Sequence, residues 1–419
     1  MKKILLIGQL TDVSGYGNAA RSYLYMLDKL HRDKEIKLSA YNYSFEDIAV
    51  VTEEEESMIG EYSLSQDLKN MRTEPSSGLL DEFISSSGYE VIFFLTNDWL
   101  SSGDLNLRRL LDESSKIYPC VVWETDQVPR LLSSSYSYHG DKISSLLCAC
   151  DWNTEVFGMQ TPYSTVTVPY FVSSKPQSKR ERGALAPLLQ KTIGDNKFVM
   201  STVFQWSERK GADILLKSIL LEFWEEEVFL ILKTYKSLGA MEQDFFQKEI
   251  EKVKGDILSS NGTSSPCKVR FIVINDILNK RDMDDIYSAS SAFITCTRGE
   301  GFGLPLAEAA INGNIVLSPS LGGHIDFLSK KENYFFDSTF EPAMLKNNIF
   351  SECMMSNWIE SSVNSVRRNA RCAFELWTAD RPVYNKRAKI SSEYTKRYLS
   401  LDRCTERMRH AILTKEPGE

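Results

Sequence analysis

Two glutamates separated by seven residues, Glu300 and Glu308, lie in the part of the sequence that is best suited to chemistry. They belong to the stretch TRGEGFGLPLAEAAINGNIVLSPSLGGHIDFL (297–328), which follows a predicted strand and opens a helix near Pro305. Glycines before this helix leave backbone N–H groups bare at its start, where the helix dipole favours an anion. They are Gly299, Gly301 and Gly303. Two carboxylates beside an anion site are suited to accept hydrogen bonds from hydroxyl groups, as a sugar and a ribose offer.

The string RGEGFGLPLAE resembles the signature of glycosyltransferase family 4 and its relatives with the two-domain GT-B fold. That signature has two glutamates separated by seven residues, with Gly-Phe-Gly-Leu-Pro after the first. The resemblance implies a nucleotide-sugar donor site in the second domain, with Glu308 on the ribose hydroxyls and Glu300 on the donor sugar. The residues expected to meet the sugar and diphosphate are Gly301, Phe302, Gly303 and Leu304. The alternative is a glycine-rich helix cap with solvated glutamates.

A second motif, VFQWSERKGADILLKSI (203–219), places Lys210 directly before an amphipathic helix. By the same resemblance, Lys210 neutralises the donor diphosphate, a role that suits a compact point charge; the alternative is a plain surface charge. The family usually carries an Arg a few residues earlier, whereas this sequence has Gln205 there. Arg209 either supplies the second cation or points to solvent.

A third motif, QLTDVSGYGNAARSY (9–23), contains Gly15 and Gly17 between a predicted strand and a helix. Taken alone it imitates a dinucleotide fingerprint, but the loop is long and no acidic residue ends the second strand. In the family the equivalent loop faces the diphosphate and the acceptor, so we assign both glycines to the donor site. A purely structural helix cap is the alternative.

Three weaker candidates stand at the ends of predicted strands. Glu124 lies where the family often carries a His or an acid near the reacting sugar, and it either contacts sugar or acceptor or is structural. Lys233 either lines the donor pocket or is structural, and Asn275 falls where the family contacts the nucleobase. We interpret His324 as a turn residue near the donor phosphate, and the pair Asp284-Asp285 as a solvated helix face rather than a metal site.

The composition is that of an ordinary globular protein, with 419 residues and a formal net charge of −8. This charge argues against a general nucleic-acid-binding protein, because phosphate contacts need a basic surplus. No apolar run approaches the roughly 18 residues of a membrane helix, and we interpret the start MKKILLIGQLTD as a buried strand. Eight dispersed cysteines without CxxC pairs indicate reduced thiols in a cytoplasmic protein and argue against structural zinc.

Short apolar runs alternate with helical patterns, which predicts an α/β fold with parallel sheets covered by helices on both faces. We expect two Rossmann-like domains of the GT-B type that face each other across a cleft. Residues 1–173 form the acceptor-side domain and 197–384 the nucleotide-sugar donor domain. Residues 174–196, rich in Ser, Lys and Pro, are predicted to be a linker, and 385–419 a helix that returns to the N-terminal domain.

Together with the resemblance, these features predict a retaining, metal-independent glycosyltransferase that moves a hexose-type sugar to a hydroxyl acceptor. The donor is a UDP-, GDP- or other nucleotide sugar, and no separate cofactor is expected. The acceptor is a glycan, a lipid-linked molecule, a protein or a small molecule. The predicted location is the cytoplasm, and a peripheral contact with the inner membrane face and the oligomeric state stay open. The predicted catalytic residues are Glu300, Lys210, Arg209 and Glu124.

Two other functions are considered. One is a non-catalytic GT-B subunit that binds a glycan or stabilises a partner enzyme, which the intact charges at Glu300, Glu308 and Lys210 argue against. The other is a nicotinamide-dependent oxidoreductase that uses GYGNAA, which lacks the acidic residue that reads the ribose. Hydrolysis of the donor by the purified protein would distinguish the transferase from a non-catalytic subunit. A test of NAD binding would distinguish it from the oxidoreductase.

Overall fold

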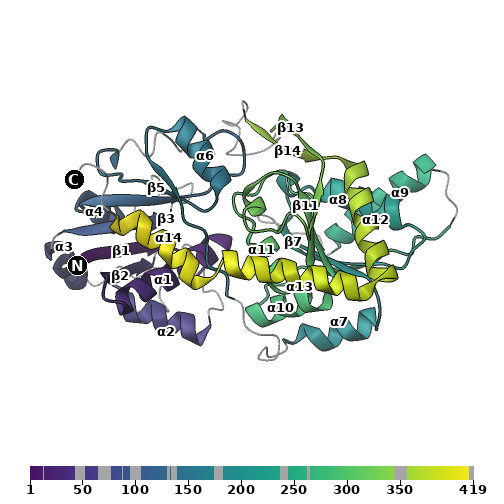
Figure 1. Ribbon diagram of the computed structural model, residues 1–419, viewed down its shortest axis with the longest axis horizontal. Helices are drawn as coiled ribbons and strands as arrows, with labels where there is room; N and C mark the ends of the chain where they lie inside the picture. Colours follow the sequence, from purple (N-terminus) through teal and green to yellow (C-terminus); the bar gives the residue numbers. More distant parts are fainter. Residues whose placement is uncertain are drawn as a thin grey trace. The chain divides into compact units, whose positions relative to one another are not determined.

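The chain divides into two units, each with its own sheet and core. Unit 1 comprises Met1–Ser173 and Tyr398–Glu419, and unit 2 comprises Ser174–Arg397. The computed structural model describes residues 1–12, 14–42, 52–64, 77–86, 88–94, 105–129, 133, 139–173, 183–235, 244–261, 265–343 and 356–414. Figure 1 shows both units and labels their elements where there is room.

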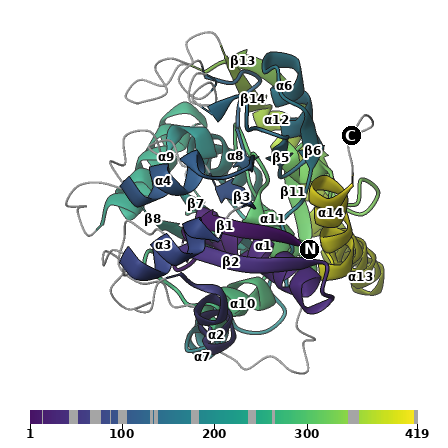
Figure 2. The same ribbon diagram turned by 90° about the vertical axis from the view of Figure 1, so that its left-hand side faces the viewer.

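Unit 1 is built on a six-stranded parallel sheet in the order β2-β1-β3-β4-β5-β6. Figure 2 shows its strands β1, β2 and β3 side by side. The strands are β1 (Lys2–Gly8), β2 (Ile36–Asn42), β3 (Tyr89–Phe94), β4 (Lys116–Val121), β5 (Leu146–Cys148) and β6 (Thr165–Thr167). Its helices before the crossing to unit 2 include α1 (Gly15–Arg32), α2 (Glu53–Tyr62), α3 (Ser77–Ser85), α4 (Leu105–Asp112) and α6 (Asp151–Gln160). The central strand β3 is buried along its whole length, as expected for a strand that is covered on both faces.

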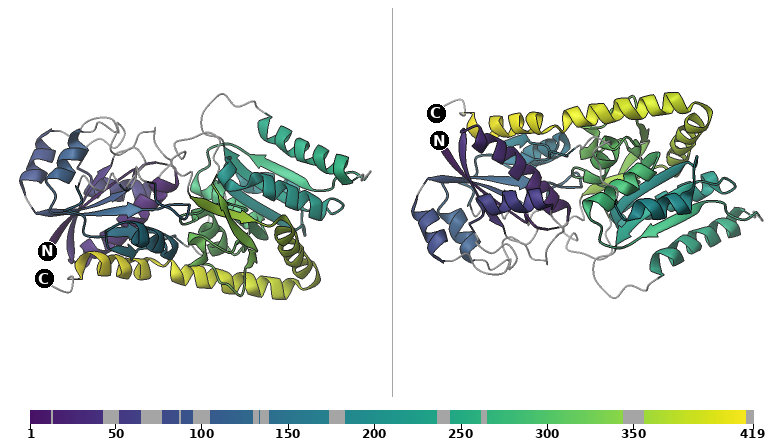
Figure 3. Two further views of the ribbon diagram at one scale, coloured as in Figure 1. Left: turned by 90° about the horizontal axis from the view of Figure 1, so that it is seen from above. Right: turned by 90° about the horizontal axis from the view of Figure 1, so that it is seen from below.

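The predicted C-terminal helix is in fact two helices, α13 (Arg381–Tyr398) and α14 (Leu401–Leu413). Ser400 caps α14, because its side chain accepts a hydrogen bond from the Arg403 amide. Only α14 belongs to unit 1, where it packs against α1, whereas α13 lies almost entirely in unit 2. The right-hand view of Figure 3 shows α14, in yellow, beside α1, in purple.

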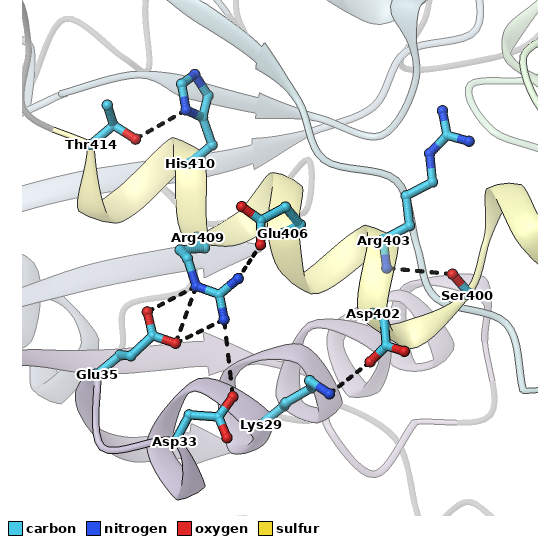
Figure 4. A network of polar contacts seen from close by, with 10 residues as sticks. All are labelled: Lys29, Asp33, Glu35, Ser400, Asp402, Arg403, Glu406, Arg409, His410 and Thr414. Atoms are coloured by element: carbon cyan, nitrogen blue, oxygen red, sulfur yellow. Dashed lines mark hydrogen bonds and ion pairs between the residues drawn. The ribbon is translucent and has the colours of Figure 1, made fainter.

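Charged side chains fix α14 to unit 1, as Figure 4 shows. The Arg409 guanidinium donates to both carboxylate oxygens of Glu35, with Nε–Oε2 and Nη2–Oε1 distances of 2.8 Å. Lys29 on α1 donates to Asp402 on α14 at 2.6 Å. The bidentate Arg409–Glu35 pair is the geometry in which a surface ion pair is most stabilising.

Unit 2 has a second six-stranded parallel sheet, in the order β12-β11-β10-β7-β8-β9. Its strands are β7 (Val199–Gln205), β8 (Phe229–Tyr235), β9 (Arg270–Ile274), β10 (Ala292–Ile294), β11 (Ile315–Pro319) and β12 (Tyr334–Phe336). A separate antiparallel pair is formed by β13 (Ser338–Pro342) and β14 (Asn357–Ser361). The helices are α7 (Leu185–Ile193), α8 (Ala212–Phe223), α9 (Phe245–Asn261), α10 (Lys280–Ala289), α11 (Leu304–Ile311) and α12 (Val363–Ala379), besides α13.

The alternation of side chains along β8 divides the core of unit 2 into two layers. Leu230 and Leu232 join a large cluster with residues of α8 and α12. Phe229 and Ile231 face the other way and join a smaller cluster with residues of α7 and α10. Since side chains alternate between the two faces of a strand, the residues at the carboxyl end of β8 are divided between the same two layers.

Helix α7 lies within residues 174–196, which the sequence analysis took as a linker. Two carboxylates of α10 cap its N-terminal end. Asp282 accepts from the Ala184 amide at 2.8 Å, and Asp285 accepts from the Ala186 amide at 2.9 Å. Both carboxylates are buried, so the prediction of a solvated face was wrong for Asp285. Their role is to satisfy amides at a helix start that would otherwise have no partner.

The predicted fold class is confirmed, since each unit has a parallel sheet of six strands that alternate with helices. The C-terminal return to the first unit is also observed, through α14 alone. Among the residues that the structure describes, no helix is long and apolar enough to cross a membrane.

Candidate functional site

The order of strands in unit 2 reverses between β7 and β10. From β7 the chain proceeds outward through β8 and β9, and from β10 it proceeds in the other direction through β11 and β12. Ligands of such sheets bind at the carboxyl ends of the strands, where the connecting loops diverge. The loops that follow β7 and β10 carry the two strongest motifs of the sequence.

An ion pair joins these two loops. Lys210 lies in a short 3-10 helix, η3 (Glu208–Lys210), after β7, and its Nζ contacts Oε1 of Glu300 in the loop after β10. The side chains are only 15% and 12% exposed, respectively, so each charge depends on the other for compensation. The structure thus places the two residues that the sequence motifs single out in direct contact.

Glu300 is held in its ionised form. Burial by itself would raise the pKa of this carboxyl, but the charges of Lys210 and Arg209 outweigh burial and hold the pKa below its ordinary value. Arg209 lies beside the same loop, where its guanidinium donates to the Gly299 carbonyl at 2.6 Å. A carboxylate in this state accepts hydrogen bonds and cannot donate one.

Gly211 allows the two loops to approach each other. Its φ of 65° is left-handed, and a Cβ on it would lie 2.0 Å from the Cys296 carbonyl oxygen after β10. Any larger residue would therefore push the η3 loop away from the loop that carries Glu300. The glycine is required here both by its backbone conformation and by the lack of space.

The start of α11 presents backbone N–H groups beside the ion pair. Gly303, with a φ of 91°, begins this helix without a side-chain cap, and Pro305 lies in the first turn. Within the described residues, the amides of Gly303 and Leu304 donate no hydrogen bond to protein. Uncovered amides at a helix start are suited to receive an anion.

Glu308, one turn into α11, has a different environment from Glu300. Tyr287 on α10 donates its hydroxyl proton to Oε2 of Glu308 at 2.8 Å. Burial raises the pKa of Glu308, while Lys280 and the Tyr287 hydroxyl act to lower it. Tyr287 was not predicted from the sequence, because nothing in the local pattern distinguishes it from a core tyrosine.

The loop after β11 packs onto the loop that carries Glu300. Gly323 donates its amide to the Glu300 carbonyl at 3.0 Å. His324 is buried, and its Nε2 lies 3.0 Å from the Pro319 carbonyl oxygen. Burial lowers the pKa of His324, so the ring is neutral at physiological pH and Nε2 is the donor in this contact. His324 thus contacts the chain of its own turn, while its nearness to a donor phosphate stays a prediction.

Arg298 is a buried residue of the site that the sequence analysis missed. Its guanidinium donates to Asp213 on α8 at 2.8 and 3.0 Å, to Glu360 on β14, and to the Glu208 carbonyl at 2.6 Å. Its own amide donates to the Arg209 carbonyl at 2.6 Å. Arg298 thus fixes η3 to the loop before Glu300, and its position two residues before that glutamate was the available signal.

The remaining sequence candidates are more dispersed. In unit 2, Lys233 is buried near the carboxyl end of β8, and Asn275 is exposed directly after β9. Phe302 is buried against Phe327, with ring centroids 4.9 Å apart. Within the described residues, no group of three or more His, Cys, Asp and Glu side chains is arranged to hold a metal ion.

Gly15, Gly17 and Glu124 belong to unit 1, whereas Lys210 and Glu300 belong to unit 2. A Cβ on Gly17 would lie 2.1 Å from the Asp12 carbonyl oxygen, so this glycine is required by the fold of the loop. Gly15 is the first residue of α1 and is exposed. Glu124 follows β4 and is partly buried, next to Trp123, whose carbonyl accepts a hydrogen bond from Asn153 at 2.7 Å.

The close approach at Gly211 predicts a loss of stability in Gly211→Ala. We expect the free energy of unfolding to fall by about 2–4 kcal/mol, because the Cβ meets a carbonyl oxygen and the backbone conformation disfavours alanine. Chemical denaturation measures this loss. The control is Gly255→Ala on α9, where a Cβ has no neighbour within 4 Å. A Gly211→Ala protein as stable as wild type would contradict this description of the loop.

The lowered pKa of Glu300 predicts a pH-dependent contribution to stability. A carboxyl whose pKa falls on folding stabilises the fold above its unfolded pKa, here about 4.5, and this contribution is lost as the pH falls through the folded value. The stability difference between wild type and Glu300→Gln should be constant from about pH 6 to 8 and shrink in acid below about pH 4.5. A difference that grows in acid would refute the pairing with Lys210.

No family model matches the sequence, and no curated protein matches it. Several solved structures are nevertheless similar in fold over nearly the whole chain. A glycosyltransferase from Rickettsia africae has a TM-score of 0.65 at 11% identity, covering 99% of each chain. Sucrose-phosphate synthase from Thermosynechococcus elongatus has a TM-score of 0.59 at 12% identity, covering 97% of each chain.

A third similar structure is Alr3699/HepE of Anabaena in complex with UDP and glucose. Its TM-score is 0.58 at 11% identity, covering 98% of this chain and 99% of the other. At such low identity these likenesses concern the fold. The chain therefore has the two-domain GT-B fold that the sequence analysis predicted.

Proposed function

We propose that the protein is a glycosyltransferase related to glycosyltransferase family 4, which transfers a hexose-type sugar from a nucleotide-diphosphate sugar to a hydroxyl acceptor. The observation that carries this proposal is the Lys210–Glu300 pair, placed where the strand order reverses and beside the amides at the start of α11. The fold likeness to Alr3699/HepE, which was solved with UDP and glucose, supports the same class of donor.

The site can bind both parts of such a donor. Lys210 has three N–H donors, so it can contact a diphosphate oxygen while it holds Glu300. The amides of Gly303 and Leu304 add two donors to the same anion. Glu300, ionised beside Lys210, accepts hydrogen bonds from hydroxyls of the donor sugar, and Glu308 accepts them from the ribose.

In the proposed reaction, the bond between the anomeric carbon and the diphosphate oxygen breaks while the acceptor oxygen bonds to that carbon on the same face. The leaving diphosphate receives the electron pair and takes the proton of the acceptor hydroxyl. Lys210 and the α11 amides stabilise the negative charge as it forms. Such electrostatic stabilisation of the transition state is usually the largest single contribution to catalysis. Gly15 and Gly17 of unit 1 are proposed to face the donor diphosphate, and Glu124 to contact the reacting sugar or the acceptor.

Tyr287 is proposed to orient Glu308 for the ribose. Its hydroxyl occupies one carboxylate oxygen at 2.8 Å, which leaves the other oxygen for a ribose hydroxyl. It also opposes the effect of burial on the pKa of Glu308 and so favours the ionised, accepting form. A carboxylate without this partner would be protonated more readily and would accept fewer hydrogen bonds.

Nucleotide binding tests the ribose assignment. Thermal shift against UDP-, GDP- and dTDP-sugars identifies the donor, and calorimetry then measures the affinity for the matching nucleoside diphosphate. Glu308→Ala should weaken this affinity by about 10- to 100-fold, because hydrogen bonds to a charged group are lost. Tyr287→Phe should weaken it less, with the larger loss at lower pH. Unchanged binding by Glu308→Ala would show that this carboxylate does not bind the ribose.

Donor hydrolysis by the purified protein tests the role of Glu300 without knowledge of the acceptor. Glu300→Ala should reduce the turnover number by about 100-fold, because a sugar-orienting contact is worth most in the transition state. The affinity for the nucleoside diphosphate alone should change by much less. Glu300→Gln, which keeps an accepting oxygen, should retain more activity. Equal losses in turnover and nucleotide binding would remove the sugar-contacting role.

A further inference from the structure

Lys233 is the one lysine that is buried among the residues that the structure describes, with 8% of its surface exposed. It lies near the carboxyl end of β8, an interior strand, opposite Val203 of β7 and Ile274 of β9. Its side chain alternates with that of Leu232, so it points to the face of the sheet that α7 and α10 cover. This is the carboxyl edge of the sheet that also carries Lys210.

The other buried cations of the described residues all have carboxylate partners. Arg21 pairs with Glu55 at 3.3 Å, and Arg298 pairs with Asp213 and Glu360. Within the same residues, the side chain of Lys233 forms no hydrogen bond or ion pair, although its backbone lies in the sheet between β7 and β9. Its ammonium group lies over the Tyr235 ring, whose centroid is 5.5 Å from Nζ.

An ammonium group in this position is costly to the fold. Burial lowers the pKa of Lys233, and Asp276 offsets this effect only in part. A buried charge that is only partly compensated destabilises the folded protein, whereas methionine would fill the same volume at no electrostatic cost. A lysine that is nevertheless present at the ligand-binding edge of a sheet is best explained by a negative charge that arrives with a ligand.

We propose that Lys233 binds a phosphate oxygen of the nucleotide and is the second cation of the diphosphate site, beside Lys210. This inference rests on the proposed function and deepens it. The resemblance leads us to expect a second cation at position 205, where this sequence has the neutral Gln205. Lys233 would supply that missing cation. Arg209 is engaged with the Gly299 carbonyl, and Arg298 with two carboxylates, so neither is as well placed to move onto a phosphate.

Calorimetry on three full-length proteins tests this assignment: wild type, Lys233→Met and Lys217→Met. Lys217 is an exposed lysine on α8 and controls for the change in net charge. The probes are UDP and GDP, each compared with its nucleoside. Lys233→Met should weaken binding of the diphosphate about 10- to 100-fold and leave nucleoside binding within about twofold. Lys217→Met should bind all probes as wild type does.

A second measurement separates a ligand-binding role from a structural one. Without nucleotide, Lys233→Met should unfold at a higher temperature than wild type, because a buried and only partly compensated charge has been removed. A lower unfolding temperature would show that Lys233 has a counter-charge within the protein and would overturn the inference. Equal diphosphate binding by Lys233→Met and wild type would overturn it too, while leaving the proposed function intact. Failure of the wild-type protein to bind any nucleoside diphosphate would overturn both.

Discussion

The ion pair between Lys210 and Glu300 is the interaction on which the candidate site depends. It joins the loop after β7 to the loop after β10, at the point where the strand order of unit 2 reverses. Neither charge is well solvated, so each holds the other in place, and Lys210 helps to keep the pKa of Glu300 below its ordinary value. The same pair therefore orders the loops and keeps a cation and a carboxylate at one edge of the sheet. A ligand that is anionic and rich in hydroxyl groups can bind to the cation through its negative charge and donate hydrogen bonds to the carboxylate.

The residues around the pair limit how these loops can move. Gly211 lets the η3 loop lie against the chain after β10, where no side chain has room. Arg298 joins η3, α8 and β14 to the residues before Glu300, and Gly323 donates to the Glu300 carbonyl from the other side. Such support is what a preorganised site requires, because donors that are already aligned need no reorganisation when charge develops. The site is thus built from loop residues that strands and helices on three sides hold in position.

The fold class and the position of the candidate site could be predicted from the sequence. Apolar strands and the spacing of Glu300 and Glu308 are signals that lie within short stretches of the chain. The resemblance assigned Glu300 and Lys210 to the same donor site, but their direct contact was not predicted, since the two residues lie far apart in the chain and meet through strand order. Tyr287, Arg298 and the capping role of Asp285 were missed, because a buried tyrosine, arginine or aspartate has no distinctive sequence pattern. Residues 174–196 were predicted to be a linker because they are rich in Ser, Lys and Pro, and the cap of helix α7 gives no local signal because it comes from α10, roughly a hundred residues later.

The most direct test of the central claim is a crystal structure of the protein with its tightest-binding nucleoside diphosphate. The account predicts that phosphate oxygens lie within about 3 Å of Lys210 Nζ and of the amide nitrogens of Gly303 and Leu304. It also predicts that a ribose hydroxyl donates to Glu308. A nucleotide bound elsewhere on the protein, with the Lys210–Glu300 pair and the start of α11 making no contact with it, would contradict the account.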